Sequence, residues 1–403
     1  MPWKDCNVLD QRLQFIADVQ RGDHAMAALC RIYGISRETG YTYWRRYQAE
    51  GPAGLHDQPR TPHTHPQAMA EATAAAILAL RAQHPTWGPV KLRQYLTRHQ
   101  PTQRWPAPSS IGALLQRHGL CHRRGRRTRV PHATPSPGLT PPDAPNIVWC
   151  IDFKGQFPTG DGQLCYPLTL TEAHSRFLLR CHALPGTAGA GVQPVLEAAF
   201  REYGLPTVLR SDNGAPFATT GLGGLSRLAV WWLKLGIRPE RIRPGRPDQN
   251  GRHERLHRTL KADLALATAP ASTLAAQQRQ FAQYRTLYNT VRPHAALDGA
   301  VPADVFQPSP RRYPDVVPGF HYPDDHQVRL IHTNGCLKWR GELLYISEAL
   351  CGEYVGIRLL TERHWVLRVG ALSVAVRDEH AACWLTRTDA QQVLRLCEEE
   401  DLL

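Results

Sequence analysis

Apolar residues recur at helical spacing along roughly the first 120 residues, in segments separated by short polar breaks. RLQFIADV predicts one helix, and HAMAALCRIYGISRETGYTYWRRYQAE predicts two more that are joined by a tight turn. Gly34 can adopt the positive φ that such a turn needs, and Ser36 is a good N-cap for the next helix. The pattern predicts a helix-turn-helix within residues 1–60, and an ordinary helical hairpin is the alternative. Its second helix would offer DNA these side chains: Arg37, Thr39, Tyr41, Thr42, Arg45 and Arg46.

The Pro/His/Thr-rich stretch HDQPRTPHTHP separates this unit from a second helical one, within residues 61–122. EATAAAILALRAQHP, TWGPVKLRQYLTRH and PSSIGALLQRHGL predict its three helices. They form a second candidate helix-turn-helix, with or without a wing. Two such units in tandem would read a longer DNA site than one.

Residues 123–145 predict a basic, Pro-rich linker that marks a domain boundary. Its arginines favour contacts to phosphates or a minor groove, although a solvated charge run is nearly as good an interpretation. These arginines are Arg123, Arg124, Arg126, Arg127 and Arg129.

From Asn146 the pattern changes to apolar strands alternating with amphipathic helices. This order predicts an α/β core over 146–308, with a mixed sheet covered by helices on both faces. Short alternating segments from about Arg329 predict a small β-barrel over 325–380, and 381–403 predicts a helical tail. The expected protein is therefore multidomain, with all-α, α/β and β parts.

The amino-acid composition indicates the kind of partner that the protein binds. The 403 residues carry a formal net charge of +13, which suits a polyanion, nucleic acid first and an anionic membrane second. A merely basic protein is the alternative. The absence of an apolar run of ~18 residues and of a signal sequence predicts a cytoplasmic protein. The ten cysteines form no C-x-x-C pair, which disfavours a Cys-rich zinc knuckle.

Three carboxylates stand out by their context. Asp152 interrupts the apolar strand NIVWCIDF, where a buried acid is costly unless it is paired or binds a cation. Asp212 follows a strand at a Gly turn, a position typical of α/β active sites. Glu254 lies in the basic segment RPGRPDQNGRHERLHRTLKADL. Taken alone, Asp212 could belong to a plain turn, and Glu254 could form a surface salt bridge.

The helix that carries Glu254 has two predicted faces. At about 100° per residue, Leu256, Leu260 and Leu264 share one face. The opposite, outward face collects Asn250, Glu254, His257, Arg258 and Lys261. We expect this face to follow a phosphate backbone, with Glu254 beside it as a ligand of Mg²⁺, which prefers oxygen ligands. Three carboxylates are enough for two ions about 3.5–4 Å apart when one acid bridges both.

At this point a resemblance is plain. WCIDFKGQF, VLRSDNGAPF and GRPDQNGRHERLHRTLK resemble the three catalytic blocks of the DDE integrase core, the RNase H-like domain of retroviral integrases and many insertion-sequence transposases. YNTVRPHAALDGAVPADVF resembles a segment of the bacterial branch, so the resemblance covers about residues 9–306. Asp212 and Glu254 are 42 positions apart, more than is usual in the family. Asp248 is a rival acid, but Glu254 fits N-G-x-x-E.

The resemblance implies phosphoryl transfer at DNA. Asp152, Asp212 and Glu254 would be the catalytic metal ligands for two Mg²⁺ or Mn²⁺ ions. Cleavage at an element's end would expose a 3′-hydroxyl, which then attacks target DNA. Further contacts to DNA or to the site are expected from Lys154, Asn213, Asn250, His257, Arg258 and Lys261.

The expected partners are double-stranded DNA of the element ends and target, and at least one further copy of the chain, in the bacterial nucleoid. Two alternatives stay open: an RNase H-like nuclease without joining activity, and a DNA-binding regulator with an inactive core.

Overall fold

The computed structural model describes residues 7–58, 69–121, 138–219, 221–243, 245–266 and 269–397. The chain divides into two compact units, Met1–Met69 and Ala70–Leu403. The arginine run at 123–129 lies outside the described residues, as do parts of the predicted linkers. Within the described ranges no helix is both long and apolar enough to cross a membrane.

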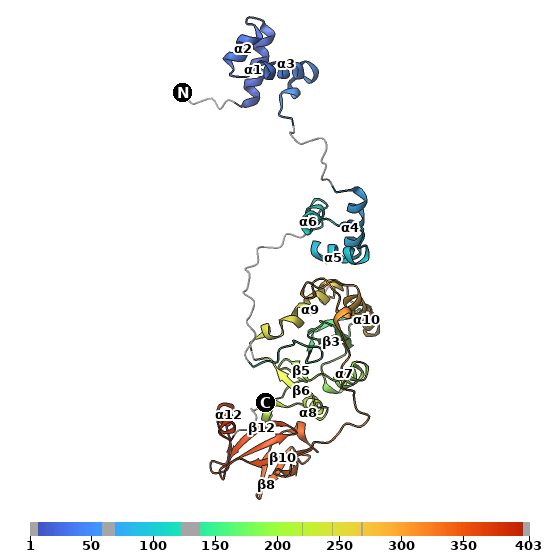
Figure 1. Cartoon of the computed structure of the whole chain (residues 1–403), viewed down its shortest axis with the longest axis vertical. Coiled ribbons are helices and arrows are strands. Elements are labelled where there is room, and N and C mark those ends of the chain that lie inside the picture. Colours follow the sequence, from blue (N-terminus) through green and yellow to red (C-terminus); the bar gives the residue numbers. More distant parts are fainter. Residues whose placement is uncertain are drawn as a thin grey trace. The chain divides into compact units, whose positions relative to one another are not determined.

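The first unit is a helical cluster (Figure 1). It contains α1 (Val8–Arg21), α2 (Met26–Ile32), α3 (Arg37–Glu50) and the short 3₁₀ helix η1 (Gly51–Leu55). Phe15, Ile16 and Leu29 lie in its buried core. Gly34 has φ +65°, and the Ser36 hydroxyl accepts a hydrogen bond of 3.1 Å from the Thr39 amide. The predicted turn and cap between the second and third helices are therefore confirmed.

The second unit begins with the three helices expected from the sequence, α4 (Glu71–Gln83), α5 (Pro89–His99) and α6 (Pro108–Arg117). Ile77, Leu92 and Ile111, one from each helix, are fully buried. Proline at the start of α5 and of α6 suits a first helical turn, because those amides have no intrahelical partner.

The α/β core is a mixed sheet. Its strands are β1 (Val148–Phe153), β2 (Phe157–Pro158), β3 (Leu164–Glu172), β4 (Leu178–Leu184), β5 (Val208–Ser211) and β6 (Arg238–Arg241). β1 pairs antiparallel with β3 and parallel with β5. β5 in turn pairs parallel with β6, while β2 and β4 both pair antiparallel with β3. The predicted mixed sheet is confirmed, and β1 lies inside it.

Helices cover both faces of this sheet (Figure 1). Because side chains alternate along a strand, Trp149 and Ile151 of β1 point into the core formed with α7 (Gly189–Tyr203) and α8 (Arg227–Lys234). On the other face, α9 (Gly251–Asp263) and α10 (Leu274–Thr290) pack on β3 and β4. Cys150 and Asp152 belong to that second set of alternating positions. Short helices join these elements: η2 (Leu222–Gly224), η3 (Pro247–Asn250), η4 (Ala295–Leu297) and α11 (Pro302–Val305).

The C-terminal region is a second β structure. It comprises β7 (Gln327–Leu330), β8 (Cys336–Trp339), β9 (Glu342–Tyr345), η5 (Glu348–Leu350), β10 (Tyr354–Leu359), β11 (His364–Val369), β12 (Leu372–Asp378), β13 (Cys383–Trp384) and α12 (Arg387–Leu396). The described strands form a sheet in the order β13-β12-β11-β10-β7 and a separate β8-β9 hairpin. This is an open order, so the closed barrel stays a prediction, whereas α12 is the helix expected in the tail.

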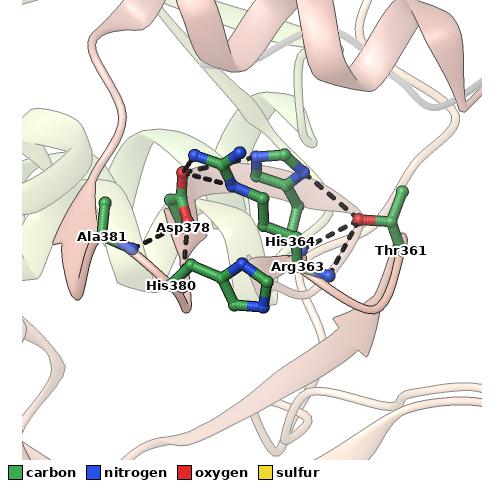
Figure 2. A network of polar contacts seen from close by, with 6 residues as sticks. All are labelled: Thr361, Arg363, His364, Asp378, His380 and Ala381. Carbon is green, nitrogen blue, oxygen red and sulfur yellow. Dashed lines mark hydrogen bonds and ion pairs between the residues drawn. The ribbon is translucent and has the colours of Figure 1, made fainter.

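A polar network holds one end of that sheet (Figure 2). Asp378, the last residue of β12, accepts hydrogen bonds of 2.8 and 2.5 Å from the Arg363 guanidinium. Its other oxygen accepts from the backbone amides of His380 and Ala381, each at 3.0 Å. Arg363 lies just before β11, so a single carboxylate joins the β10–β11 turn to the β12–β13 turn. These contacts, with the Arg363 side chain first, hold the pKa of Asp378 far below its ordinary value.

Candidate active site

Two of the three predicted acids lie side by side at the ends of neighbouring parallel strands. β1 and β5 are paired with Cys150 opposite Arg210. Continuing this register by two residues places Asp212 level with Asp152. Neighbouring strands are only about 4.8 Å apart, and ends of parallel strands are where α/β sheets bind ligands. The sheet therefore brings together two carboxylates that are 60 positions apart in the sequence.

The turn after β5 fixes the orientation of Asp212. Its Oδ1 accepts a hydrogen bond of 3.1 Å from the Gly214 amide. Asn213 donates from its side-chain amide to the Ile242 carbonyl at 2.6 Å, which ties the turn to the segment after β6. The Asp212 side chain stays half-buried rather than enclosed. Asn213 therefore supports the turn, and its predicted DNA contact stays a prediction.

The buried face of α9 differs from the prediction. His253, Leu256, His257 and Leu260 are all buried, whereas Glu254 and Arg258 are exposed. The buried stripe has the spacing i, i+3, i+4, i+7 of a helix that packs on a sheet. The expectation that His257 lies on the outward face is therefore wrong. Asn250, at the start of the helix, is also only 5% exposed.

Threonines of β3 explain why histidines are tolerated there. Thr169 lies opposite Asp152 in the β1–β3 register, and its Oγ1 donates to the Asp152 carbonyl at 3.1 Å. The same Oγ1 lies 2.6 Å from Nε2 of His253 and 2.7 Å from Nε2 of His257. Nδ1 of His253 lies 3.2 Å from Oγ1 of Thr171. The buried imidazoles are thus hydrogen-bonded, as buried polar groups must be.

Burial and charge act strongly on this cluster. Burial first, and then the negative charges of Asp212 and Glu254, raise the pKa of Asp152 to about 7, although the Phe153 amide and the charge of Lys154 act in the opposite direction. The charges of Asp212 and of Glu254 therefore both reach Asp152. Burial also lowers the pKa of His253 to about 3 and that of His257 to about 2, so both rings are neutral at pH 7.

Among the described residues, Asp152, His253 and His257 form a group with ligand atoms within 4.8 Å of one another. The group of Asp152, Asp212 and Glu254 does not meet that limit. The sequence reading missed His253 and Thr169. The sequence did contain a signal for His253. It lies four residues before His257 and three before Leu256, and residues three or four apart share a helix face.

The other predicted contact residues are spread over separate elements. On α3, Arg37, Tyr41 and Arg45 are exposed, while Thr39 and Arg46 are half-buried. Near the acids Lys154 is half-buried, and its charge reaches Asp152. Arg258 and Lys261 are exposed on α9 beside Glu254. Lys154 therefore lies near Asp152, and Arg258 and Lys261 lie on the helix that carries Glu254.

A buried ion pair supports the strand that leads to Asp212. Arg210 of β5 and Glu240 of β6 have side chains only 8% and 9% exposed, with Nη2 and Oε2 2.6 Å apart. Glu240 also accepts from the amide and hydroxyl of Thr140 at 2.8 and 2.7 Å. The pair therefore holds β5, β6 and the segment before β1 together.

A mixed sheet between helices, with two carboxylates where neighbouring parallel strands end, is an arrangement suited to binding a divalent cation. Family models sharpen this assignment. The "Integrase core domain" models match residues 142–247 and 235–302. A "Helix-turn-helix domain" model matches 11–63, and a "Homeodomain-like domain" model matches 39–115.

Curated relatives agree with these matches. The chain is 30% identical over 194 residues to the insertion element IS407 uncharacterized 31.7 kDa protein of Burkholderia multivorans, which covers 48% of this chain and 67% of that protein. It is 25% identical over 274 residues to the insertion element IS476 uncharacterized 39.2 kDa protein of Xanthomonas euvesicatoria, covering 68% and 70%. The chain thus belongs to the integrase-core family of insertion-element proteins, and it is an enzyme of the DDE transposase/integrase type.

More distant similarities extend to viruses. The Gag-Pol polyprotein of baboon endogenous virus is 32% identical over 141 residues, 35% of this chain but only 8% of the polyprotein. Among solved structures, the HTLV-2 integrase catalytic core domain in complex with magnesium matches 40% of this chain and 97% of its own, with 13% identity and a TM-score of 0.32. A chain of the simian T-cell lymphotropic virus intasome matches 72% and 95%, with 14% identity and a TM-score of 0.36. The assignment to the family does not depend on these weaker likenesses.

Proposed function

We propose that this chain is a transposase that binds the terminal repeats of a mobile element, cuts the DNA there and joins the exposed 3′ end to target DNA. Asp152, Asp212 and Glu254 are its catalytic carboxylates. The observation that carries the proposal is the juxtaposition of Asp152 with Asp212 at the ends of β1 and β5, with the charge of Glu254 acting on Asp152 from α9.

The donor set fits divalent cations. The negative charges of Asp212 and Glu254 raise the pKa of Asp152, and a cation at Asp152 would relieve that repulsion. Carboxylate oxygens are the ligands that Mg²⁺ and Mn²⁺ take in enzymes acting on phosphates. We therefore assign two such ions to the site, and Asp152, Asp212 and Glu254 would hold them.

When bound, the ions supply the positive charge that stabilises a phosphorane-like transition state and lowers the cost of deprotonating the attacking hydroxyl. The chain's own residues orient the acids. Gly214 fixes Asp212 through its amide, and Thr169 fixes the backbone at Asp152. Lys154, Arg258 and Lys261 hold the DNA backbone near the scissile phosphate by charge.

The helical units supply DNA recognition. We assign α3 to a major groove through Arg37, Tyr41 and Arg45, and α4 to α6 to the adjacent part of the terminal repeat. The arginines at 123–129 would follow the DNA phosphates.

Bringing two element ends together requires at least two copies of the chain. Its DNA lies in the bacterial nucleoid, where we expect the protein to act. Within this proposal, the C-terminal strands close into the small barrel.

Two variants test the assignment with the full-length chain. Asp152→Asn and Glu254→Gln should abolish both cleavage and joining of labelled donor ends, because each removes one charge from the metal site. Both should bind the same DNA almost as well as the wild type. Asp248→Asn is the matched control, since this nearby acid does not fit N-G-x-x-E, and it should retain both steps.

The same assay separates the alternatives. Strand-transfer products from the wild type support a transposase. Cleavage without joining would instead support a nuclease, and binding without either step would support a regulator with an inactive core. Metal-dependent cleavage that survives in Asp152→Asn would refute the catalytic assignment.

A further inference from the structure

His257 presents one ring nitrogen to the acid cluster. Its Nδ1 lies 3.8 Å from Oδ2 of Asp152. That distance is too long for a hydrogen bond, so no proton is shared between the two atoms. The contact faces the carboxylate at the centre of the proposed metal site, from the same turn of α9 that carries Glu254.

The hydrogen bonds of Thr169 decide which ring nitrogen of His257 is left to face Asp152. The single hydroxyl hydrogen of Thr169 goes to the Asp152 carbonyl, which is only an acceptor. Thr169 Oγ1 must then accept from both histidines, so Nε2 of His253 and Nε2 of His257 carry the protons. Nε2 is therefore the nitrogen of His257 that donates to Thr169, and Nδ1 is the nitrogen that faces Asp152.

His253 does not share this property. Its Nε2 donates to Thr169, and its Nδ1 lies within hydrogen-bond distance of the Thr171 hydroxyl. Both of its ring nitrogens are therefore occupied by threonines, although the ring is one of the three groups that lie within 4.8 Å. The two histidines, four residues apart on one helix, have different roles.

We propose that Nδ1 of His257 is a metal ligand, so that the ion held by Asp152 and Glu254 has a mixed nitrogen and oxygen coordination. This inference rests on the proposed function, since it needs the carboxylate metal site. Two ligand bonds of roughly 2.1 Å each span the 3.8 Å between Nδ1 and Oδ2 with one ion between them. Glu254 and His257 also have the Glu-x-x-His spacing with which one helix turn supplies two ligands in di-metal proteins.

The surroundings of His257 are those of a ligating histidine. Such a ring usually donates its second N–H to a fixed acceptor, which sets its tautomer and orientation. Thr169 is that acceptor at 2.7 Å, and it is itself fixed by the carbonyl of the neighbouring ligand, Asp152. An imidazole ligand favours transition metals over Mg²⁺. The site should therefore select Mn²⁺ more strongly than carboxylates alone would.

The test is pulsed electron paramagnetic resonance of Mn²⁺ bound to the metal-free, full-length protein. Wild-type protein should show ¹⁴N modulation from a directly bound nitrogen, and labelling with ¹⁵N-histidine should change it. His257→Gln keeps an amide N–H for Thr169 and lacks Nδ1, so it should bind Mn²⁺ without the modulation. His253→Gln, equally buried on the same helix, is the matched control and should retain it.

The outcomes separate this inference from the proposed function. Mn²⁺ that binds the wild type and is lost in Asp152→Asn, but shows no nitrogen coupling, overturns the ligand role of His257 and leaves the carboxylate site standing. Coupling that persists in His257→Gln also overturns it. Wild-type protein that binds no Mn²⁺ overturns both ideas. The wild-type spectra decide the matter even if a variant fails to fold.

Thr169 is a positioning residue under this proposal. Thr169→Ser keeps the hydroxyl and should keep the Mn²⁺ affinity, whereas Thr169→Val removes the acceptor that fixes the His257 tautomer. The valine variant should lose about 10- to 100-fold in Mn²⁺ affinity, the usual effect of removing such a supporting group. Equal affinity in the two variants would contradict the tautomer argument.

Discussion

The buried ion pair behind Asp212 provides a quantitative test of the structure. Glu240→Gln keeps the size of the side chain but removes its charge and turns one acceptor into a donor. The Arg210 guanidinium, 8% exposed, then loses its counter-charge, and the new amide hydrogens face donors on Arg210 or on Thr140. Breaking a buried pair by changing one partner typically costs about 3–5 kcal/mol in the free energy of unfolding.

The expected effect is large enough for calorimetry. At roughly 2–4 °C per kcal/mol for a region of this size, the unfolding transition of the α/β core should fall by about 6 to 20 °C. Glu197→Gln is the matched control in the same core. Its partner Arg201 lies one helical turn away at 2.8 Å, and the two side chains are 53% and 36% exposed, Arg201 first. Such an exposed pair contributes little to stability, so this variant should unfold close to the wild type.

The comparison of the two variants decides the result. If Glu240→Gln unfolds within experimental error of Glu197→Gln, the pair is not buried in solution as the structure has it. The double variant Arg210→Met/Glu240→Leu should recover most of the lost stability, because it removes both charges together. A double variant as unstable as Glu240→Gln would show that packing, rather than an unpaired charge, explains the loss.

Three further predictions follow from other parts of the chain. Gly40→Ala should destabilise the first unit by about 1–3 kcal/mol in chemical unfolding, because its Cβ would meet Cys30 Sγ at 2.5 Å. Gly112→Ala, whose Cβ would meet only Pro89 Cγ at 3.5 Å, should instead be neutral or stabilising. Asp378→Asn should lower the unfolding midpoint of the C-terminal sheet at neutral pH. The pKa of the Asp378 carboxylate is depressed in the folded state, so this group stabilises the sheet at pH values above its unfolded pKa of about 3.9. The stabilisation is lost as the pH falls below that value, and the unfolding curves of the variant and the wild type should then converge. DNA affinity should fall with salt at a logarithmic slope of roughly −4 or steeper, and a flat dependence would contradict the electrostatic footprint.

Much of the fold follows from local signals. The turn between α2 and α3 needs only a residue that tolerates φ +65° and a hydroxyl that caps the next helix, and Gly34 and Ser36 provide both. The alternation of apolar strands with amphipathic helices was enough to place β1, α7 and β5. Each of these signals acts over a few residues, so the sequence reveals it directly.

The prediction for α9 failed for a physical reason. The helical repeat correctly predicts which residues share a face, but the leucines alone do not give the extent of the buried face. Burying a histidine is costly unless it finds a hydrogen-bond partner. The partners of His253 and His257 are hydroxyls of β3, more than 80 positions earlier in the chain. Nothing near α9 in the sequence indicates them.

The sequence by itself was enough to single out the three candidate catalytic acids. Asp152 lies inside an apolar strand, Asp212 lies at a strand end, and Glu254 lies in a basic helix. Only the tertiary structure decided their neighbours. β5 pairs with β1 although β3 and β4 come between them in the chain, and that pairing sets Asp212 beside Asp152. The packing of α9 on the sheet also places His257 on the buried side. A residue that was expected to contact DNA therefore faces a carboxylate instead. Strand order and helix orientation depend on contacts between distant segments, and local patterns of polarity do not encode them.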